Sequence, residues 1–139
     1  MPSPPFISAE AVELAFYHAF ENNDFAAMQH VWDDAEDIAC IHPMAQILHG
    51  RRAVMASWRD MLSGGVGMRF TLEPVQIYRV ENLTIHLLNE HIAVVNGNRV
   101  APMVATNIFR LGAQGWRMVL HHASPNPGSQ TENTHARLH

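Results

Sequence analysis

The ten histidines of this 139-residue chain are its most frequent candidates for chemistry, but their spacing argues against a metal site. His42 and His49 flank a segment that contains a proline, and the adjacent His121 and His122 would point to opposite faces of a strand. The acidic run 33–37 lacks the glycine and the terminal glutamate of a calcium-binding loop. We therefore expect no metal ion.

Several kinds of cofactor and nucleophile chemistry are excluded by residues that the chain lacks. All nine basic residues are arginine, and without lysine neither a Schiff base nor lysine-anchored pyridoxal phosphate can form. No Gly-x-Ser-x-Gly nucleophile motif occurs. The glycines at 64, 65 and 67 follow a helical pattern, whereas a dinucleotide-binding motif follows a strand. We expect no cofactor, and the sequence assigns no catalytic residue.

The candidate binding site consists of amphipathic side chains that interrupt the apolar faces of the predicted elements. Ligand pockets are mostly apolar and have a few converging polar groups. Each candidate also has a purely structural interpretation: the tryptophans as core, the tyrosine as reaching to water, and the others as hydrogen-bonded interior residues. The residues that we expect to line a cavity between helices and sheet are Tyr17, Trp32, His42, Trp58, Asn107 and His122.

Two of these histidines are expected to face the same cavity. In the last predicted strand His122 shares a face with alternate apolar residues, and in the first predicted strand His42 shares a face with Ile38 and Cys40. Each apolar stripe needs a core to face, so the two imidazoles should converge. An alternative stays open: a bulge near a proline of the sheet would turn His121 inward in place of His122.

Three helical patterns occupy the first half of the chain. The first is capped by Ser8 and ends at 22–23, where Asp24 caps a shorter second helix. The third follows Gly50 and ends in the glycine-rich stretch 63–67. All helical signal stops there, so the rest of the domain should be built from strands.

The strand patterns have a period of two, apart from an expected bulge or kink at 73–74. Segment 83–88 is either a strand of its own or an extension of its neighbour, and 96–97 (Asn-Gly) predicts a tight hairpin. In chain order, the predicted strands are 38–42, 68–77, 83–88, 91–95, 100–111 and 116–124.

Helices followed by antiparallel strands predict an α+β fold in which the helices gather on one side of a curved sheet. The strand 100–111 is apolar on both faces, with Val104 and Ile108 on one and Met103 and Phe109 on the other. The helices of the same chain can cover only one face, so a second copy is the simplest cover for the other. With only 16% charged residues as further support, we expect a homodimer.

Composition bears on partners and location. The net charge is −4 and the arginines are scattered, so nucleic acid is not an expected partner. No apolar run is long enough to cross a membrane, and the first residues lack a signal-peptide pattern. The single cysteine, Cys40, cannot form an internal disulfide. We expect a cytoplasmic protein with no membrane partner.

Several short segments, in this order, resemble a known family. They are AFENND at 19–24, Trp32 followed by acids up to IHP at 41–43, GRRAV at 50–54 with SW at 57–58, ATNIF at 105–109, GWRMV at 115–119 and HHASP at 121–125. Together they resemble the SnoaL-like branch of the nuclear transport factor two-like superfamily, which includes the association domain of calmodulin-dependent kinase. The resemblance covers 8–125, with 1–7 as an N-terminal extension and 126–139 as a C-terminal tail.

The resemblance implies a cone-shaped, cystatin-like α+β roll, with a strongly curved antiparallel or mixed sheet wrapped around N-terminal helices, and a homodimer. The cyclase, isomerase and hydrolase branches of that superfamily place carboxylates in the pocket, whereas the later predicted strands of this chain contain no aspartate. We expect a domain that binds a small apolar or amphipathic molecule. The alternatives are a lyase, cyclase or isomerase that uses a pocket histidine as general base, and a catalytically inert assembly module.

Overall fold

A computed structural model describes residues 4–95, 97 and 102–127. Asn96, half of the predicted hairpin turn, lies outside the described residues, as does the beginning of the predicted strand 100–111. The described remainder of that strand is β5, Met103–Gly112.

The three helices begin where the sequence predicts. They are α1 (Ala9–Glu21), α2 (Phe25–Val31) and α3 (Arg51–Ser63). The side chain of Ser8 accepts a hydrogen bond from the backbone of Ala11 at 3.0 Å, and Asp24 accepts one from Ala27 at 3.0 Å. Both side chains satisfy backbone N–H groups that a helix start leaves unpaired, so both predicted caps are confirmed.

The strands form one six-stranded sheet in the order β2-β1-β6-β5-β4-β3. β1 runs parallel to β6, and every other neighbouring pair is antiparallel. The predicted α+β class with a mixed, curved sheet is therefore confirmed. The strands other than β5 are β1 (Ala39–Ile41), β2 (Leu48–His49), β3 (Met68–Val80), β4 (Leu83–Val94) and β6 (Gly115–Pro125).

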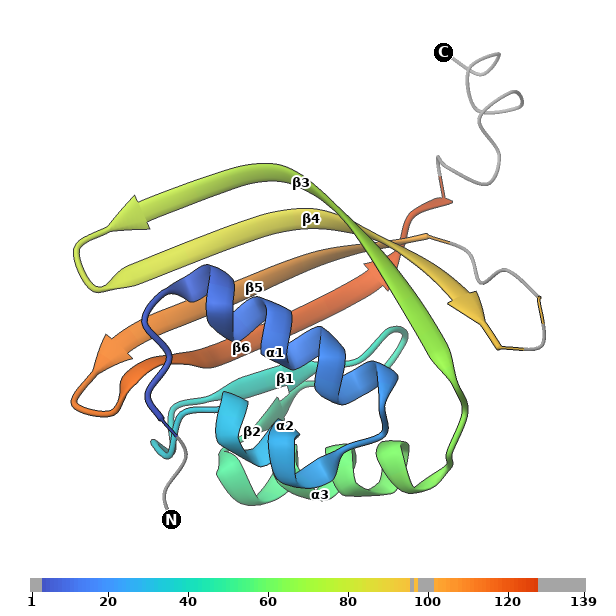
Figure 1. Ribbon diagram of the computed structural model, residues 1–139, viewed down its shortest axis with the longest axis horizontal. Coiled ribbons are helices and arrows are strands. Elements are labelled where there is room, and N and C mark those ends of the chain that lie inside the picture. Colours follow the sequence, from blue (N-terminus) through green and yellow to red (C-terminus); the bar gives the residue numbers. More distant parts are fainter. Residues whose placement is uncertain (1–3, 96, 98–101, 128–139) are drawn as a thin grey trace.

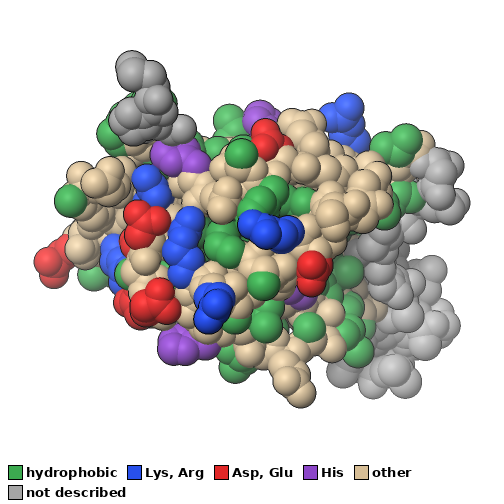
Figure 2. Space-filling model, turned by 90° about the horizontal axis from the view of Figure 1, so that it is seen from below, with side chains coloured by type: hydrophobic (Ala, Val, Ile, Leu, Met, Phe, Trp, Pro, Cys, Tyr) green, Lys and Arg blue, Asp and Glu red, His purple; other side chains and the backbone are tan. Residues whose placement is uncertain are grey.

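Helix α1 lies in the concave side of the curved sheet, with α2 and α3 beyond it (Figure 1). The core fills the space between these layers. Its largest fully buried side chains include Trp32, Trp58, Phe16 and Phe109. The ring of Phe16 packs edge-on against Trp58, with centroids 5.4 Å apart. Figure 2 shows the surface of the molecule on the side of α2 and α3 that faces away from the sheet. Acidic, basic and hydrophobic side chains are mixed on this surface.

Two bulges shape the strands. The first is the predicted one in β3, where the register with β4 shifts between Pro74 and Gln76. The second lies in β6: Ile108 pairs with Leu120 but Phe109 pairs with Met118, so Val119 is the extra residue. A bulge reverses which face the following residues occupy, and this reversal decides which histidine of β6 faces inward.

The described part of the chain has no helix that is both long and apolar enough to span a membrane.

Candidate functional site

A cavity of about 220 Å³ lies at the end of the sheet where β3 and β5 begin and β4 and β6 end. The end of α1, the end of α3 and the segment after β1 complete its wall. Most of its lining is apolar, and three side chains bring ionisable groups to it. The lining residues are Phe20, His42, Pro43, Met61, Met68, Phe70, Glu90, Ile92, Met103, His121 and Ala123.

The prediction that His122 faces this cavity is wrong, and His121 takes that place. His121 is only 2% exposed and lines the cavity, whereas His122 is exposed and lines a groove on the outer face of the sheet. The cause is the bulge at Val119: Met118 and Val119 are both buried, and the alternation restarts one residue later. The sequence left this exchange of the two histidines open, with a bulge near a proline as the expected cause.

His42 does lie on the cavity wall, as predicted. Its ring packs edge-on against Trp58 at 4.9 Å, and its Nε2 lies 3.1 Å from the hydroxyl of Ser57. Burial lowers the pKa of this imidazole. His42 is therefore an imidazole of reduced basicity among the residues that line the cavity, as is His121.

The other predicted residues lie behind the wall rather than on it. Tyr17 and Asn107 are buried and reach the cavity only through hydrogen bonds to residues that line it. Trp32 and Trp58 are fully buried in the core and are not among the lining residues, in line with their structural interpretation. Of the six candidates, His42 alone lines the cavity directly.

The carboxylate of the cavity, Glu90, was not among the residues predicted from the sequence. It lies near the end of β4, is 3% exposed, and accepts a hydrogen bond of 2.5 Å from the hydroxyl of Tyr17. Burial raises its pKa to about 7, with a further contribution from the charge of Glu13, while the Tyr17 hydrogen bond opposes the shift. The carboxyl group can therefore both release and bind a proton near neutral pH.

The burial pattern of the whole strand β4 shows that Glu90 faces the interior. Thr84, His86, Leu88 and Glu90 alternate with less buried residues and all point inward. That period-two pattern is visible only when 83–94 is taken as one strand, as the structure shows it to be. Divided into 83–88 and 91–95, the pattern leaves Glu90 in a connection between strands.

A polar row crosses the inner face of the sheet beside the cavity. His86 on β4, Asn107 on β5 and His121 on β6 lie directly opposite one another on adjacent strands. The amide nitrogen of Asn107 donates to Glu13 at 3.0 Å and to Tyr17 at 3.2 Å, and its oxygen lies 2.6 Å from Nδ1 of His121. Asn107 thus connects α1 to His121 directly and to Glu90 through Tyr17.

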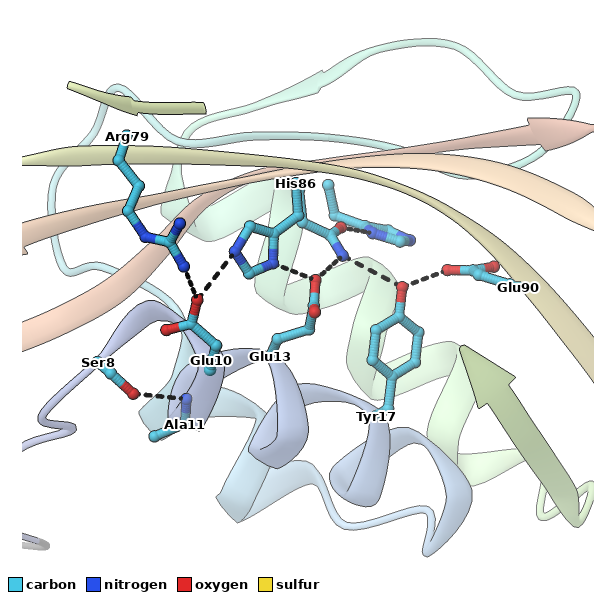
Figure 3. A network of polar contacts seen from close by, with 10 residues as sticks. Ser8, Glu10, Ala11, Glu13, Tyr17, Arg79, His86 and Glu90 are labelled. Atoms are coloured by element: carbon cyan, nitrogen blue, oxygen red, sulfur yellow. Dashed lines mark hydrogen bonds and ion pairs between the residues drawn. The ribbon is translucent and has the colours of Figure 1, made fainter. Parts of the chain in front are cut away.

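The row continues away from the cavity through charged groups. Nδ1 of His86 lies 3.0 Å from Glu13, and Nε2 lies 3.6 Å from Glu10, which is also paired with Arg79 at 2.7 Å. Figure 3 shows these side chains between α1 and the sheet, with Tyr17 reaching Glu90 at the other end. The buried ring of His86 therefore lies between two carboxylates, and its Nε2 has no hydrogen-bond partner among the described residues.

Metal and thiol chemistry find no support in the described residues. No group of three or more histidine, cysteine, aspartate or glutamate side chains in 4–95, 97 and 102–127 could hold a metal ion. Cys40 is buried as a free thiol, and burial raises its pKa to about 12. A thiol of this kind has almost no thiolate at neutral pH and is a poor nucleophile.

Comparison with known proteins identifies the family. A sequence model of the SnoaL-like domain matches residues 9–127, which is most of the chain. The chain therefore belongs to the SnoaL-like family, within the nuclear transport factor 2-like (NTF2-like) superfamily. The resemblance inferred from the sequence segments is confirmed.

Solved structures with the same fold carry several descriptions. A candidate calcium/calmodulin-dependent protein kinase type II association domain from Thiobacillus denitrificans is 40% identical, with a TM-score of 0.84 over 89% of this chain and 99% of that one. A candidate dehydratase of the NTF2-like family from Streptomyces avermitilis is 30% identical, with a TM-score of 0.76 over 84% and 92%. A ketosteroid isomerase-like protein from Erwinia carotovora shares the fold at 16% identity, with a TM-score of 0.68 over 84% and 92%.

A curated relative is much longer than this domain. The F-box protein SKIP8 of Arabidopsis thaliana is 24% identical over 114 residues, which are 82% of this chain and 48% of that protein. The chain thus spans about half the length of that relative.

Proposed function

We propose that this domain binds a small, mostly apolar molecule in the cavity at the end of the sheet. The observation that carries the proposal is the composition of the wall: apolar side chains with Glu90, His42 and His121 converging among them. A dry cavity of about 150 Å³ in another protein binds benzene. The cavity here, at about 220 Å³, therefore suits a single substituted ring or a small bicyclic molecule.

A second function, proton transfer on the bound molecule, is favoured by Glu90 in particular. A group with a pKa near the working pH is the most effective general acid or base, and the pKa of Glu90 is raised to about 7. Burial lowers the pKa of His121 to about 3, so this ring is a poor proton acceptor at neutral pH. The proposed base is therefore Glu90 and not a histidine. The candidate dehydratase and the ketosteroid isomerase-like protein among the relatives point to chemistry of the same general kind.

Both proposals are tested on the folded, full-length chain. Native mass spectrometry of protein purified without denaturation would detect a retained ligand, and cyclic ketones, enones and epoxides provide a panel for turnover. We expect Glu90→Gln to abolish turnover and Glu81→Gln, at the exposed turn between β3 and β4, to preserve it. Ligand binding without any turnover would leave the first proposal standing and reject the second.

We also propose that two copies pair through the outer face of the sheet. That face carries a groove of about 400 Å³ whose lining includes Val75, Leu87 and Val104. Val75 is 62% and Val104 39% exposed, which is unusual for side chains that strands normally bury. A stable pair should bury more than about 1,000 Å² in total.

The assembly-module interpretation remains the alternative, supported by the candidate kinase association domain at 40% identity. It predicts that the cavity binds nothing and that only the pairing surface is functional. Burying ionisable side chains lowers the stability of a fold, and such groups cluster at functional sites. The converging polar groups of the cavity therefore favour a ligand over a purely structural role. The native mass spectrum and the ligand titrations below separate the two.

We place the protein in the cytoplasm. Support comes from Cys40, which is a buried free thiol and has no cysteine partner in the chain. Reducing compartments preserve such thiols. Localisation of a fluorescent fusion in intact cells tests this placement.

A further inference from the structure

The hydrogen bonds behind the cavity wall determine where the protons lie. Nδ2 of Asn107 is 3.0 Å from a carboxylate oxygen of Glu13, which is itself 3.0 Å from Nδ1 of His86. A carboxylate accepts and does not donate, so the amide group that faces Glu13 is the NH₂. The amide oxygen of Asn107 therefore faces His121, and its orientation follows from the network.

This orientation selects one tautomer of His121. Its Nδ1 lies 2.6 Å from Oδ1 of Asn107, and an amide oxygen can only accept, so the proton is on Nδ1. Burial lowers the pKa of the ring to about 3, which keeps it neutral at physiological pH. Nε2 consequently carries a lone pair, and no described residue forms a hydrogen bond with it.

The same network withdraws the hydroxyl of Tyr17 from any ligand. Tyr17 accepts from Asn107 at 3.2 Å, and its own proton is donated to Glu90 at 2.5 Å. Its pKa is raised well above the ordinary value, mainly by burial and then by the Glu90 charge, so it stays a neutral phenol. Tyr17 therefore has no free proton for a ligand carbonyl, and among the ionisable lining side chains only the protonated form of Glu90 could donate one.

A similar argument applies to the second histidine of the wall. The hydroxyl of Ser57 donates to the carbonyl of Val54 at 2.8 Å, so its oxygen accepts from Nε2 of His42 at 3.1 Å, and the sulfur of Cys40, a weak acceptor, lies 3.7 Å from the same nitrogen. This leaves the lone pair of His42 on Nδ1. Among the described lining side chains, both rings thus offer acceptor nitrogens at neutral pH, and Glu90 is the carboxyl group whose pKa burial raises to about 7.

We infer that the ligand of this cavity is a neutral alcohol or phenol whose hydroxyl donates a hydrogen bond to Nε2 of His121, an inference that rests on the proposed function. A ketone has no proton to offer and would leave the Nε2 lone pair without a partner, and its carbonyl could accept only from the protonated form of Glu90, which is lost as pH rises above about 7. A carboxylate would add a second negative charge beside Glu90 in an apolar wall. The cavity should therefore select for a donor, with the rest of the molecule apolar.

The test compares ligands that differ only in this group. Cyclohexanol with cyclohexanone, and 1-indanol with 1-indanone, are titrated into protein with ¹³C-labelled methionine methyl groups, since Met61, Met68 and Met103 line the cavity. We expect the alcohols to bind at least about fivefold more tightly, the effect of one hydrogen bond of about 1 kcal/mol. Ketones that bind as tightly as the alcohols would overturn the inference and sustain the proposed function. Failure of all four to bind would overturn both.

Two further measurements separate His121 from its neighbour. His121→Phe should remove the preference for alcohols, while the matched variant His122→Phe, on the outer face, should retain it. Because His121→Phe risks misfolding, the tautomer is also measured in the unmodified protein by ¹⁵N spectroscopy of the histidine rings. Protonated Nδ1 and unprotonated Nε2 between pH 6 and 8 support the inference, whereas a proton on Nε2 contradicts it.

Discussion

The hydroxyl of Tyr17 donates a hydrogen bond of 2.5 Å to Oε2 of Glu90 in the interior of the protein. This bond joins α1 to β4 next to the cavity, and Asn107 holds the tyrosine from behind. The phenol keeps its proton because burial raises its pKa, whereas the carboxyl group of Glu90 exchanges its proton near pH 7. The titrating acid of the cavity wall is thus held by a neutral donor that lies behind the wall.

Replacing this acid should stabilise the protein at high pH. In the folded chain the pKa of Glu90 is about 7, above the ordinary 4.5, so between these values the folded state binds more protons than the unfolded one. The stability of the unmodified protein therefore falls as pH rises from 4.5 to 7, by about 2 to 3 kcal/mol from this residue. We expect Glu90→Gln to gain that amount above pH 7 and almost nothing below pH 4.5, as measured by urea unfolding across the pH range.

Glu81→Gln provides the control for this series. Glu81 is exposed at a turn, and the same change there should alter stability equally little at every pH. If the difference in unfolding free energy between Glu90→Gln and the unmodified protein stayed constant from pH 4.5 to 8, the pKa of Glu90 would not be raised in the folded protein.

Asn107 should be the most costly polar residue of the site to remove. It is fully buried and makes hydrogen bonds to Glu13, Tyr17 and His121, all of which lose a partner together. Each buried group left unsatisfied costs about 1 to 3 kcal/mol, so Asn107→Ala should destabilise the fold by about 3 kcal/mol or more in urea unfolding. Asn89→Ala, which removes two longer contacts at a half-buried site, should cost less than about 1 kcal/mol. Equal losses from both variants would argue against the network.

Cys40 should be inert in the native protein. It is buried, as expected for the apolar strand face that it shares with Ile38, and burial raises its pKa to about 12. A thiol reagent should label it at least about a hundredfold more slowly in native protein than in urea, because labelling must wait for the chain to open. Rapid native labelling at pH 8 would show that the strand β1 opens locally or that the thiol is accessible.

The outer face of the sheet should control the oligomeric state. Leu87 lines the outer groove, and Leu87→Glu would place a charge there, so we expect this variant to sediment as a monomer. Leu14→Glu, at an exposed position of α1, is the matched control and should leave a dimer intact. Sedimentation velocity at high micromolar concentration decides the matter, since an unmodified chain that stays monomeric there would refute the proposed pair.

Much of the fold could be predicted because its signals are local. Ser8 and Asp24 cap helices through their own side chains, and the kink at Pro74 follows from a residue that cannot donate to a neighbouring strand. These features need no knowledge of the rest of the chain. The mixed, strongly curved sheet around the N-terminal helices was expected only through the resemblance to a family, and the order of the strands was not predicted.

The site was less predictable because two of its residues depend on strand register. The bulge at Val119 cannot be recognised in the sequence, because Met118 and Val119 are both apolar and either could face the core. His121 therefore could not be distinguished from His122 by alternation alone. Glu90 was missed because charged side chains normally face water, and its burial depends on a partner, Tyr17, 73 positions away in the chain.

The most direct test of a titrating acid inside a ligand cavity is the pKa of Glu90 itself. Its carboxyl carbon can be followed by ¹³C NMR in uniformly labelled protein from pH 4 to 9, with Glu90→Gln to assign the signal. Because burial raises the pKa of Glu90 to about 7, we predict that the glutamate signal lost in Glu90→Gln has a midpoint near 7. Addition of saturating cyclohexanol should move that midpoint, because ligand and proton share the cavity. A midpoint near 4.5 that ligand leaves unchanged would contradict the account.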